Sequence, residues 1–251
     1  MLSKNKLKLV RSLQHKKYRQ KYNKFTVEGE KILTELLQQD VFEIDSIFAT
    51  PSFIQTNEEI LKFYLKKTIT VGSSELRQLS SLSTPTEVVA LVNFNEEMKA
   101  GPNVSSWAFY LDGIQNPGNL GTILRIADWF GWHQVFASPG SADLFNAKVL
   151  QASMGAFLRV RLHYRSLDEI QAQYPDLPLY GADMGGENVF TAAPMEPGLL
   201  LIGNEGKGLS AEARSKVDRF LSIPGAKGPK AESLNAAVAA GILCAQLSNP
   251  A

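Results

Sequence analysis

The feature that most constrains the fold of this chain is a regular alternation of short apolar stretches with helix-length segments after residue 106. Such alternation is typical of an α/β domain, in which helices cover both faces of a mostly parallel sheet. Ligands of these sheets bind beyond the carboxyl ends of the strands, so a site is expected in the loops at those ends. We expect strands at 107–111, 134–137, 159–163, 179–182, 199–203 and 220–223, and helices at 121–130, 146–157, 167–174 and 233–247.

The first 92 residues show a shorter version of the same pattern, which predicts a separate small α/β/α domain. It ends where the sequence NFNEEMKAGPNVSS, which begins at Asn93, supplies Gly, Pro, Asn and Ser without apolar periodicity. We therefore predict a first domain at 1–95, a linker at 96–105 and a second domain at 106–251. Within the first domain we expect a helix up to about Tyr18, strands at 25–27, 44–49, 68–71 and 88–92, and helices at 30–39 and 57–65.

Composition excludes several protein classes. No apolar stretch approaches the ~18 residues of a membrane span, and the most apolar one covers only 236–245. The first segment carries charges where a signal peptide needs an apolar core. A single cysteine, Cys244, allows neither an internal disulfide nor a cysteine zinc site, and the three histidines are scattered. We expect a cytoplasmic protein without a membrane partner and without a bound metal.

Charge is distributed unevenly along the chain. Residues 1–31 hold ten Lys or Arg and two Glu, a net charge of +8, whereas the other 220 residues carry a net charge of −7. Tyr18 and Tyr22 lie among these charges, and basic side chains interleaved with aromatic ones suit RNA, with its phosphates and stackable bases. A solvated helix face is the alternative interpretation. The candidate RNA-binding residues of this block are Lys16, Lys17, Arg19 and Lys21.

Three glycine-bearing loops follow expected strands. In the first, DGIQNPGNLGTILR, Asn119 lies at a helix start six residues before Arg125, and a helix cap is the alternative to a functional role. In the second, LLLIGNEGKGLS, Glu205 follows an apolar strand; the loop lacks the phosphate-binding fingerprints, and its carboxylate suits a cationic ligand. In the third, IPGAKGPKAESLNAAVA, Ser233 and Asn235 can cap an Ala-rich helix.

Together these loops resemble the three motifs of the SpoU (TrmH-type) RNA ribose 2'-O-methyltransferases of the SPOUT class. The matching sequences are NPGNLGTILR, IGNEGKGLS, and IP followed by ESLNAAVA, and the resemblance extends over about 107–247. The segment between Pro224 and Ser233 is about two residues longer than the family's common form. The N-terminal region is similar to the ribosomal-protein-like substrate-binding domain that precedes the catalytic domain in many members.

The resemblance implies S-adenosylmethionine as methyl donor, held by a C-terminal trefoil knot, and a homodimer that acts on RNA. Carried over position by position, it gives a polar catalytic set and a cofactor-binding set. The catalytic set is Asn119, Arg125, Glu205, Ser233 and Asn235, and the cofactor set is Ala182, Gly203, Asn204, Glu205, Gly208, Ile223, Ser233 and Leu234.

Methyl transfer to a ribose hydroxyl needs alignment and an oxygen that gives up its proton. A guanidinium is effectively always protonated, so we expect Arg125 to bind a phosphate beside the target ribose and to stabilise the developing alkoxide rather than to act as a base. Ribosomal RNA is the expected substrate. Transfer RNA, or a non-catalytic RNA-binding or ribosome-assembly role for the same fold, are the alternatives.

Overall fold

The structure, a computed structural model, describes residues 2–39, 41–94, 104, 106–227 and 231–248. The chain divides into two compact units, one formed by residues 1–100 and 145–158 and the other by 101–144 and 159–251. Most of the predicted linker, 96–105, lies outside the described residues, as does part of the long segment between Pro224 and Ser233.

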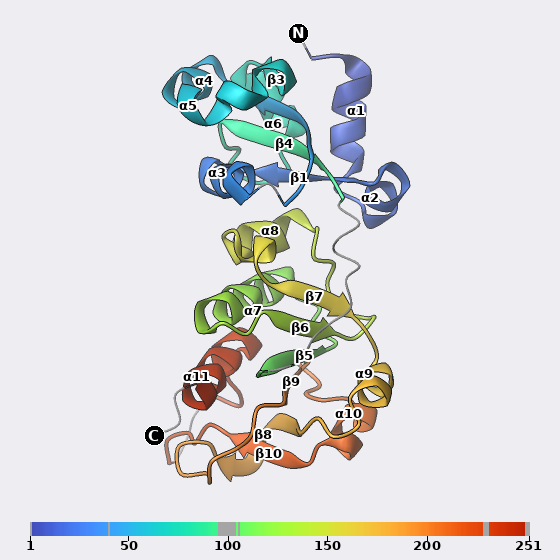
Figure 1. Cartoon of the computed structure of the whole chain (residues 1–251), viewed down its shortest axis with the longest axis vertical. Helices are drawn as coiled ribbons and strands as arrows, with labels where there is room; N and C mark the ends of the chain where they lie inside the picture. The colour runs from blue at the N-terminus through green and yellow to red at the C-terminus, as the bar shows by residue number, and fades with distance from the viewer. Residues whose placement is uncertain (1, 40, 95–103, 105, 228–230, 249–251) are drawn as a thin grey trace. The chain divides into compact units, whose positions relative to one another are not determined.

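The first unit contains a four-stranded sheet in the order β1-β4-β2-β3 (Figure 1). Strand β4 runs antiparallel to β1 and β2, while β2 and β3 are parallel. Apolar residues of α1, α6, β2 and β4 form one core cluster, which includes Val10, Leu76, Phe48 and Leu91. The elements are α1 Lys4–Ser12, α2 Lys16–Tyr22, β1 Lys24–Glu28, α3 Glu30–Gln39, β2 Ile44–Ala49, α4 Pro51–Thr56, α5 Glu58–Leu61, η1 Lys62–Lys67, β3 Thr68–Thr70, α6 Ser73–Leu79 and β4 Val88–Asn93, and this unit also includes α8 Ala147–Ser153 and η3 Ala156–Leu158.

The second unit is a six-stranded sheet in the order β10-β8-β9-β5-β6-β7, with every neighbouring pair parallel. Helices α7 and α11 cover one face, and α9 and α10 cover the other (Figure 1). This arrangement confirms the predicted α/β class with a mostly parallel sheet. The elements are β5 Ala108–Asp112, α7 Pro117–Phe130, β6 Gln134–Ala137, β7 Arg161–Tyr164, α9 Leu167–Gln173, β8 Leu179–Asn188, β9 Leu199–Gly203, α10 Ala211–Lys216, β10 Arg219–Ser222 and α11 Ala236–Ser248.

Several boundaries differ from those expected. Helix α7 begins four residues before the expected 121, because Asn116 caps it and Pro117 occupies its first position. The helix expected at 146–157 breaks after Ser153, since Met154 and Gly155 both take positive φ angles, 50° and 91°. Strand β8 continues to Asn188 along β10, with a register shift. The helix predicted up to about Tyr18 is divided into α1 and α2, and the one predicted at 57–65 into α5 and η1. The short helices α4, α6 and α10 were not predicted.

Candidate functional site

The first two loops are adjacent because their strands are. Strands β5 and β9 pair in the centre of the sheet, and their last residues, Asp112 and Gly203, are partners in the register. The loops that follow them therefore leave the same carboxyl edge side by side. They are joined there by Ser210, whose backbone N–H donates to Asp112 Oδ2 at 2.7 Å. Asp112 was not among the predicted residues, although a carboxylate that ends an apolar strand is itself a signal.

Asn119 links the first loop to the second. It lies in the first turn of α7 and is 8% exposed. Its Nδ2 donates to Glu205 Oε1 at 2.7 Å, across 86 residues of sequence. Within the second loop the backbone is held by Asn204, whose Oδ1 accepts from the N–H groups of Gly206 and Lys207.

Asn235 links the third loop to the first. Its Nδ2 donates to Asn119 Oδ1 at 3.0 Å, across 116 residues, while its own Oδ1 accepts from the N–H of Ala237 at 2.9 Å and so caps α11. The predicted cap is therefore confirmed for Asn235, and the same side chain also reaches the first loop. The result is a hydrogen-bond chain, Asn235–Asn119–Glu205, that unites three loops far apart in sequence. We call it the asparagine–glutamate chain.

The second loop closes tightly on itself. The N–H of Asn204 donates to the carbonyl of Gly208 and the N–H of Gly208 to the carbonyl of Asn204, both at 2.9 Å. A Cβ on Gly203 would lie 2.2 Å from the carbonyl carbon of Gly208, so only glycine fits there. Gly208 has a φ of +69°, a conformation that side chains disfavour. The loop thus presents backbone groups and two exposed charged residues, Glu205 and Lys207, at the sheet edge.

Arg125 does not join the asparagine–glutamate chain. Six residues along a helix turn the side chain by about 120° from Asn119, and Arg125 lies exposed on the outer face of α7. Among the described residues no hydrogen bond or ion pair holds its guanidinium. One turn further on, Trp129 is also exposed, at 84%.

The remaining predicted cofactor residues lie in or beside β8, β10 and α11. Ala182 follows Gly181, which pairs with Leu201 of β9. Ile223 directly follows β10. Ser233 and Leu234 are exposed just before Asn235, and no described contact ties the Ser233 hydroxyl to the asparagine–glutamate chain.

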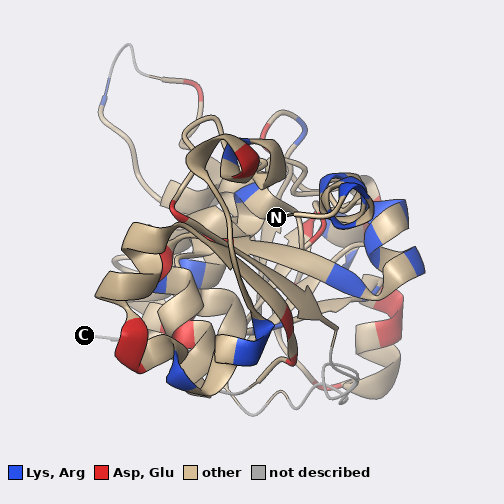
Figure 2. Cartoon of the chain, turned by 90° about the horizontal axis from the view of Figure 1, so that it is seen from above, with Lys and Arg blue, Asp and Glu red and all other residues tan. Residues whose placement is uncertain are grey.

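In the first unit the basic block forms α1 and α2, where Figure 2 shows Lys and Arg along the helix that begins at the N-terminus. Lys16, Lys17 and Lys21 are exposed on α2. Arg19 differs: it is 3% exposed, and its Nη1 donates to the carbonyls of Leu13 and Gln14 at 2.7 and 3.0 Å. Its assignment as an RNA contact is corrected accordingly, because this guanidinium fixes the turn between α1 and α2.

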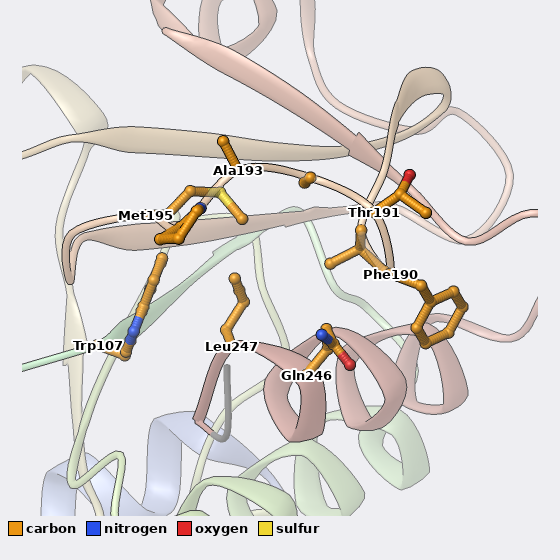
Figure 3. Close-up of a pocket in the computed structure, with 10 residues that line it drawn as sticks. Trp107, Phe190, Thr191, Ala193, Met195, Gln246 and Leu247 are labelled. Atoms are coloured by element: carbon orange, nitrogen blue, oxygen red, sulfur yellow. The ribbon is translucent and has the colours of Figure 1, made fainter. Parts of the chain in front are cut away.

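A pocket elsewhere in the second unit has different chemistry. It measures about 200 Å³ and lies between the segment after β8 and the last turn of α11 (Figure 3). Gln246 is about 16 Å along the helix from Asn235, given the rise of 1.5 Å per residue. No charged side chain lines this pocket, whose polar side chains are Thr191 and Gln246. The residues are Trp107, Val189, Phe190, Thr191, Ala192, Ala193, Pro194, Met195, Gln246 and Leu247.

Other titratable groups of the described residues are structural. Burial raises the pKa of the Cys244 thiol to about 12, which keeps it protonated and unreactive near neutral pH. Burial and the nearby Arg161 and Arg165 lower the pKa of His163, whose Nε2 lies 2.9 Å from Gln134 Oε1. The described residues contain no group of three or more His, Cys, Asp or Glu that could hold a metal. In the same part of the chain we find no helix with the length and apolar character to cross a membrane.

Comparison with known proteins decides the family. The sequence profile of the SpoU rRNA methylase family matches residues 106–245, and that of the MRM3-like substrate-binding domain matches 4–90. This chain belongs to the SpoU rRNA methylase family. The resemblance to this family is thereby confirmed, and all three loops lie within the matched residues.

Relatives match along the whole chain. It is 31% identical over 244 residues to the 23S rRNA (guanosine(2553)-2'-O)-methyltransferase RlmP of Bacillus subtilis, an alignment that covers 95% of this chain and 94% of that protein. A solved structure from Porphyromonas gingivalis, assigned to the TrmH family of RNA methyltransferases, is 35% identical, with a TM-score of 0.84 over 98% of both chains. The fold also matches the SpoU methyltransferase AviRb of Streptomyces viridochromogenes in complex with AdoMet, with 24% identity and a TM-score of 0.84 over 98% of this chain and 97% of that one.

Proposed function

We propose that this protein transfers a methyl group from S-adenosylmethionine to the 2'-hydroxyl of a ribose in ribosomal RNA. The observation that carries the proposal is the asparagine–glutamate chain, which draws the three family motifs into one site at the carboxyl edge of the sheet. Membership of an rRNA methylase family supports it, as does the likeness to a 23S rRNA 2'-O-methyltransferase over nearly the full chain.

The cofactor residues fit S-adenosylmethionine in their chemistry. The closed loop from Gly203 to Gly208 brings backbone groups together with the exposed Glu205, and a carboxylate suits a ligand with a sulfonium and an ammonium group. Gly203, Ile223 and Leu234 would hold adenine and sugar through their backbone, with Ala182, Asn204, Gly208 and Ser233 beside them. When bound, S-adenosylmethionine supplies an electrophilic methyl group on sulfur.

Arg125 acts on the acceptor. In this assignment its exposed guanidinium binds the phosphate next to the target ribose and stabilises the oxygen as it loses its proton. Asn119 holds the first loop to Glu205 and Asn235 holds the third loop to Asn119, so that acceptor and donor sites keep a fixed separation. This arrangement supplies orientation and electrostatic stabilisation, and it needs no catalytic histidine or metal.

We also propose the finer features that the family resemblance implies: a trefoil knot around the second and third loops, a homodimer and a cytoplasmic location. Exposed apolar side chains of α7 and of the start of α11 support the dimer, since Trp129, Leu234 and Val238 are 84%, 49% and 50% exposed. In the same proposal residues 1–95 bind RNA, 96–105 link the domains and 106–251 carry out the transfer.

The experiment is transfer of labelled methyl from S-adenosylmethionine to isolated 23S rRNA, followed by alkaline hydrolysis. A methylated 2'-oxygen cannot attack the neighbouring phosphate, so the label should remain in alkali-resistant dinucleotides. Transfer RNA is assayed in parallel, and label that appears in it alone would show that transfer RNA is the substrate. Absence of label in every RNA, with the cofactor bound, would favour a non-catalytic RNA-binding protein.

A further inference from the structure

Helix α2 has a surface that phosphate binding alone does not explain. Tyr18 and Tyr22 lie one turn apart on it, with ring centroids 6.3 Å apart and planes inclined by only 16°. His15 continues the row on the other side of Tyr18, 6.3 Å away and edge-on. Tyr22 at the end of the row is 40% exposed, which leaves part of its ring open to a further aromatic group.

Cations accompany both tyrosine rings. Lys17 Nζ lies 4.9 Å from the centroid of Tyr18, and Lys21 Nζ lies 5.4 Å from that of Tyr22. Both lysines are exposed. No acidic residue occurs from Leu2 to Val27, so nothing on α1 or α2 competes with an anion for these charges. Ring faces and ammonium groups are thus presented together.

The helix that carries the row is anchored at both ends. Arg19, on the buried side of α2, donates to two carbonyls of the preceding turn. Asn23 ends the helix in a left-handed conformation with φ 54°, directly after Tyr22. Anchoring of the helix and the contact between the two rings reduce the conformational entropy that is lost when a ligand stacks on them.

We propose that Tyr22, backed by Tyr18, is a stacking platform for an unpaired nucleotide of the RNA substrate, with Lys17 and Lys21 contacting the flanking phosphates. The inference rests on the proposed function in taking RNA as the substrate. Aromatic rings beside cations are the chemistry by which proteins bind single-stranded RNA, whereas a paired base offers no free face to stack. The substrate class is therefore RNA with an accessible base in a loop, bulge or junction.

The test uses the full-length protein and a single-stranded RNA 12-mer with its perfect duplex as probes, in fluorescence anisotropy. We expect the single strand to bind more tightly than the duplex. Tyr22→Ala should weaken single-strand binding about 5- to 100-fold, the range seen for loss of one stacked base, while Tyr22→Phe retains it. The salt dependence should be nearly unchanged in Tyr22→Ala, because both lysines that neutralise phosphates remain.

Phe63→Ala provides the matched control. Phe63 is 84% exposed on η1 and also lies beside a lysine, Lys62 at 5.2 Å, yet it has no stacked partner ring among the described aromatic pairs. Phe63→Ala should leave the affinity for the single-stranded RNA unchanged. Wild-type affinity in Tyr22→Ala, equal losses in both alanine variants, or equal binding of single strand and duplex would overturn the platform. These binding outcomes are independent of methylation, so failure of wild type to methylate any RNA would refute the proposed function separately.

Discussion

The asparagine–glutamate chain and the α1–α2 surface use polar residues in opposite ways. At the sheet edge each asparagine has a partner, and the hydrogen bonds join segments 86 and 116 residues apart. On α1 and α2 exposed lysines follow one another within a short stretch, and no carboxylate occurs from Leu2 to Val27. Partnered groups fix a geometry, and unopposed charges attract an anion of variable shape. We therefore assign the orientation of groups for methyl transfer to the asparagine–glutamate chain, and the capture of the RNA substrate to the α1–α2 surface.

This contrast also explains what could be predicted from sequence. The α1–α2 surface depends on residues that are close together in sequence, so the distribution of charge along the chain was enough to locate it. Arg19 shows that this distribution does not tell which side of a helix is buried. The site residues were identified because their motifs resemble those of a known family. Their hydrogen bonds were not predictable, since the partnership of Asn119 with Glu205 depends on β5 and β9 being neighbours in the sheet.

Two helix boundaries that differ from the predicted ones also have local causes. The start of α7 depended on which of two asparagines acts as cap, and Asn116 rather than Asn119 accepts from the first N–H groups. The break after α8 depended on Met154 adopting a left-handed conformation, which a non-glycine residue rarely does.

The largest expected effect is on the rate of methyl transfer. Arg125→Ala should lower the single-turnover methylation rate by about 100- to 1,000-fold, as for removal of a preorganised electrostatic group. Arg125→Lys should keep measurable activity, since it retains the charge but loses the planar fork. Affinity for S-adenosylmethionine, measured by calorimetry, should hardly change in either variant. A rate for Arg125→Lys that rises with pH as its amine loses its proton would show a general base instead.

The next effect concerns the second loop. Gly203→Ala forces a Cβ against the backbone of Gly208 and Leu209, neither of which can rotate away. We expect S-adenosylmethionine affinity to fall at least about tenfold, with a lower melting temperature. Gly140→Ala, where nothing lies within 4 Å of the added carbon, is the control and should behave as wild type. Unchanged cofactor affinity in Gly203→Ala would place the cofactor away from this loop.

A moderate effect should mark the basic surface. Replacing Lys16, Lys17 and Lys21 by Gln should raise the KM for RNA and flatten its dependence on salt. The logarithmic slope should fall by about 0.7 for each phosphate of a single strand that is no longer neutralised. The rate at saturating RNA should stay the same. If that rate fell as much as we expect for Arg125→Ala, the lysines would act in methyl transfer itself and not only in RNA binding.

The smallest effect is expected at a surface ion pair of the second unit. The hydrogen bond from Arg214 lowers the pKa of Asp183. A lowered carboxyl pKa stabilises the fold above the unfolded-state pKa, and this contribution is lost as pH falls through the folded-state value. Arg214→Ala should therefore lower the melting temperature at pH 7 by at most about 3 °C, with the difference vanishing near pH 2. A difference that persisted in acid would have to come from the packing of Arg214 on Phe220.

The most direct test of the whole account is a map of 2'-O-methylated riboses in ribosomal RNA from cells without this gene, complemented with either wild-type protein or Arg125→Ala. The account predicts that one or more riboses of 23S rRNA lose their methyl group in the absence of the gene. Wild type should restore it, and Arg125→Ala should not, although it still binds the cofactor and the RNA. A map with no change at any ribose, or full restoration by Arg125→Ala, would contradict it.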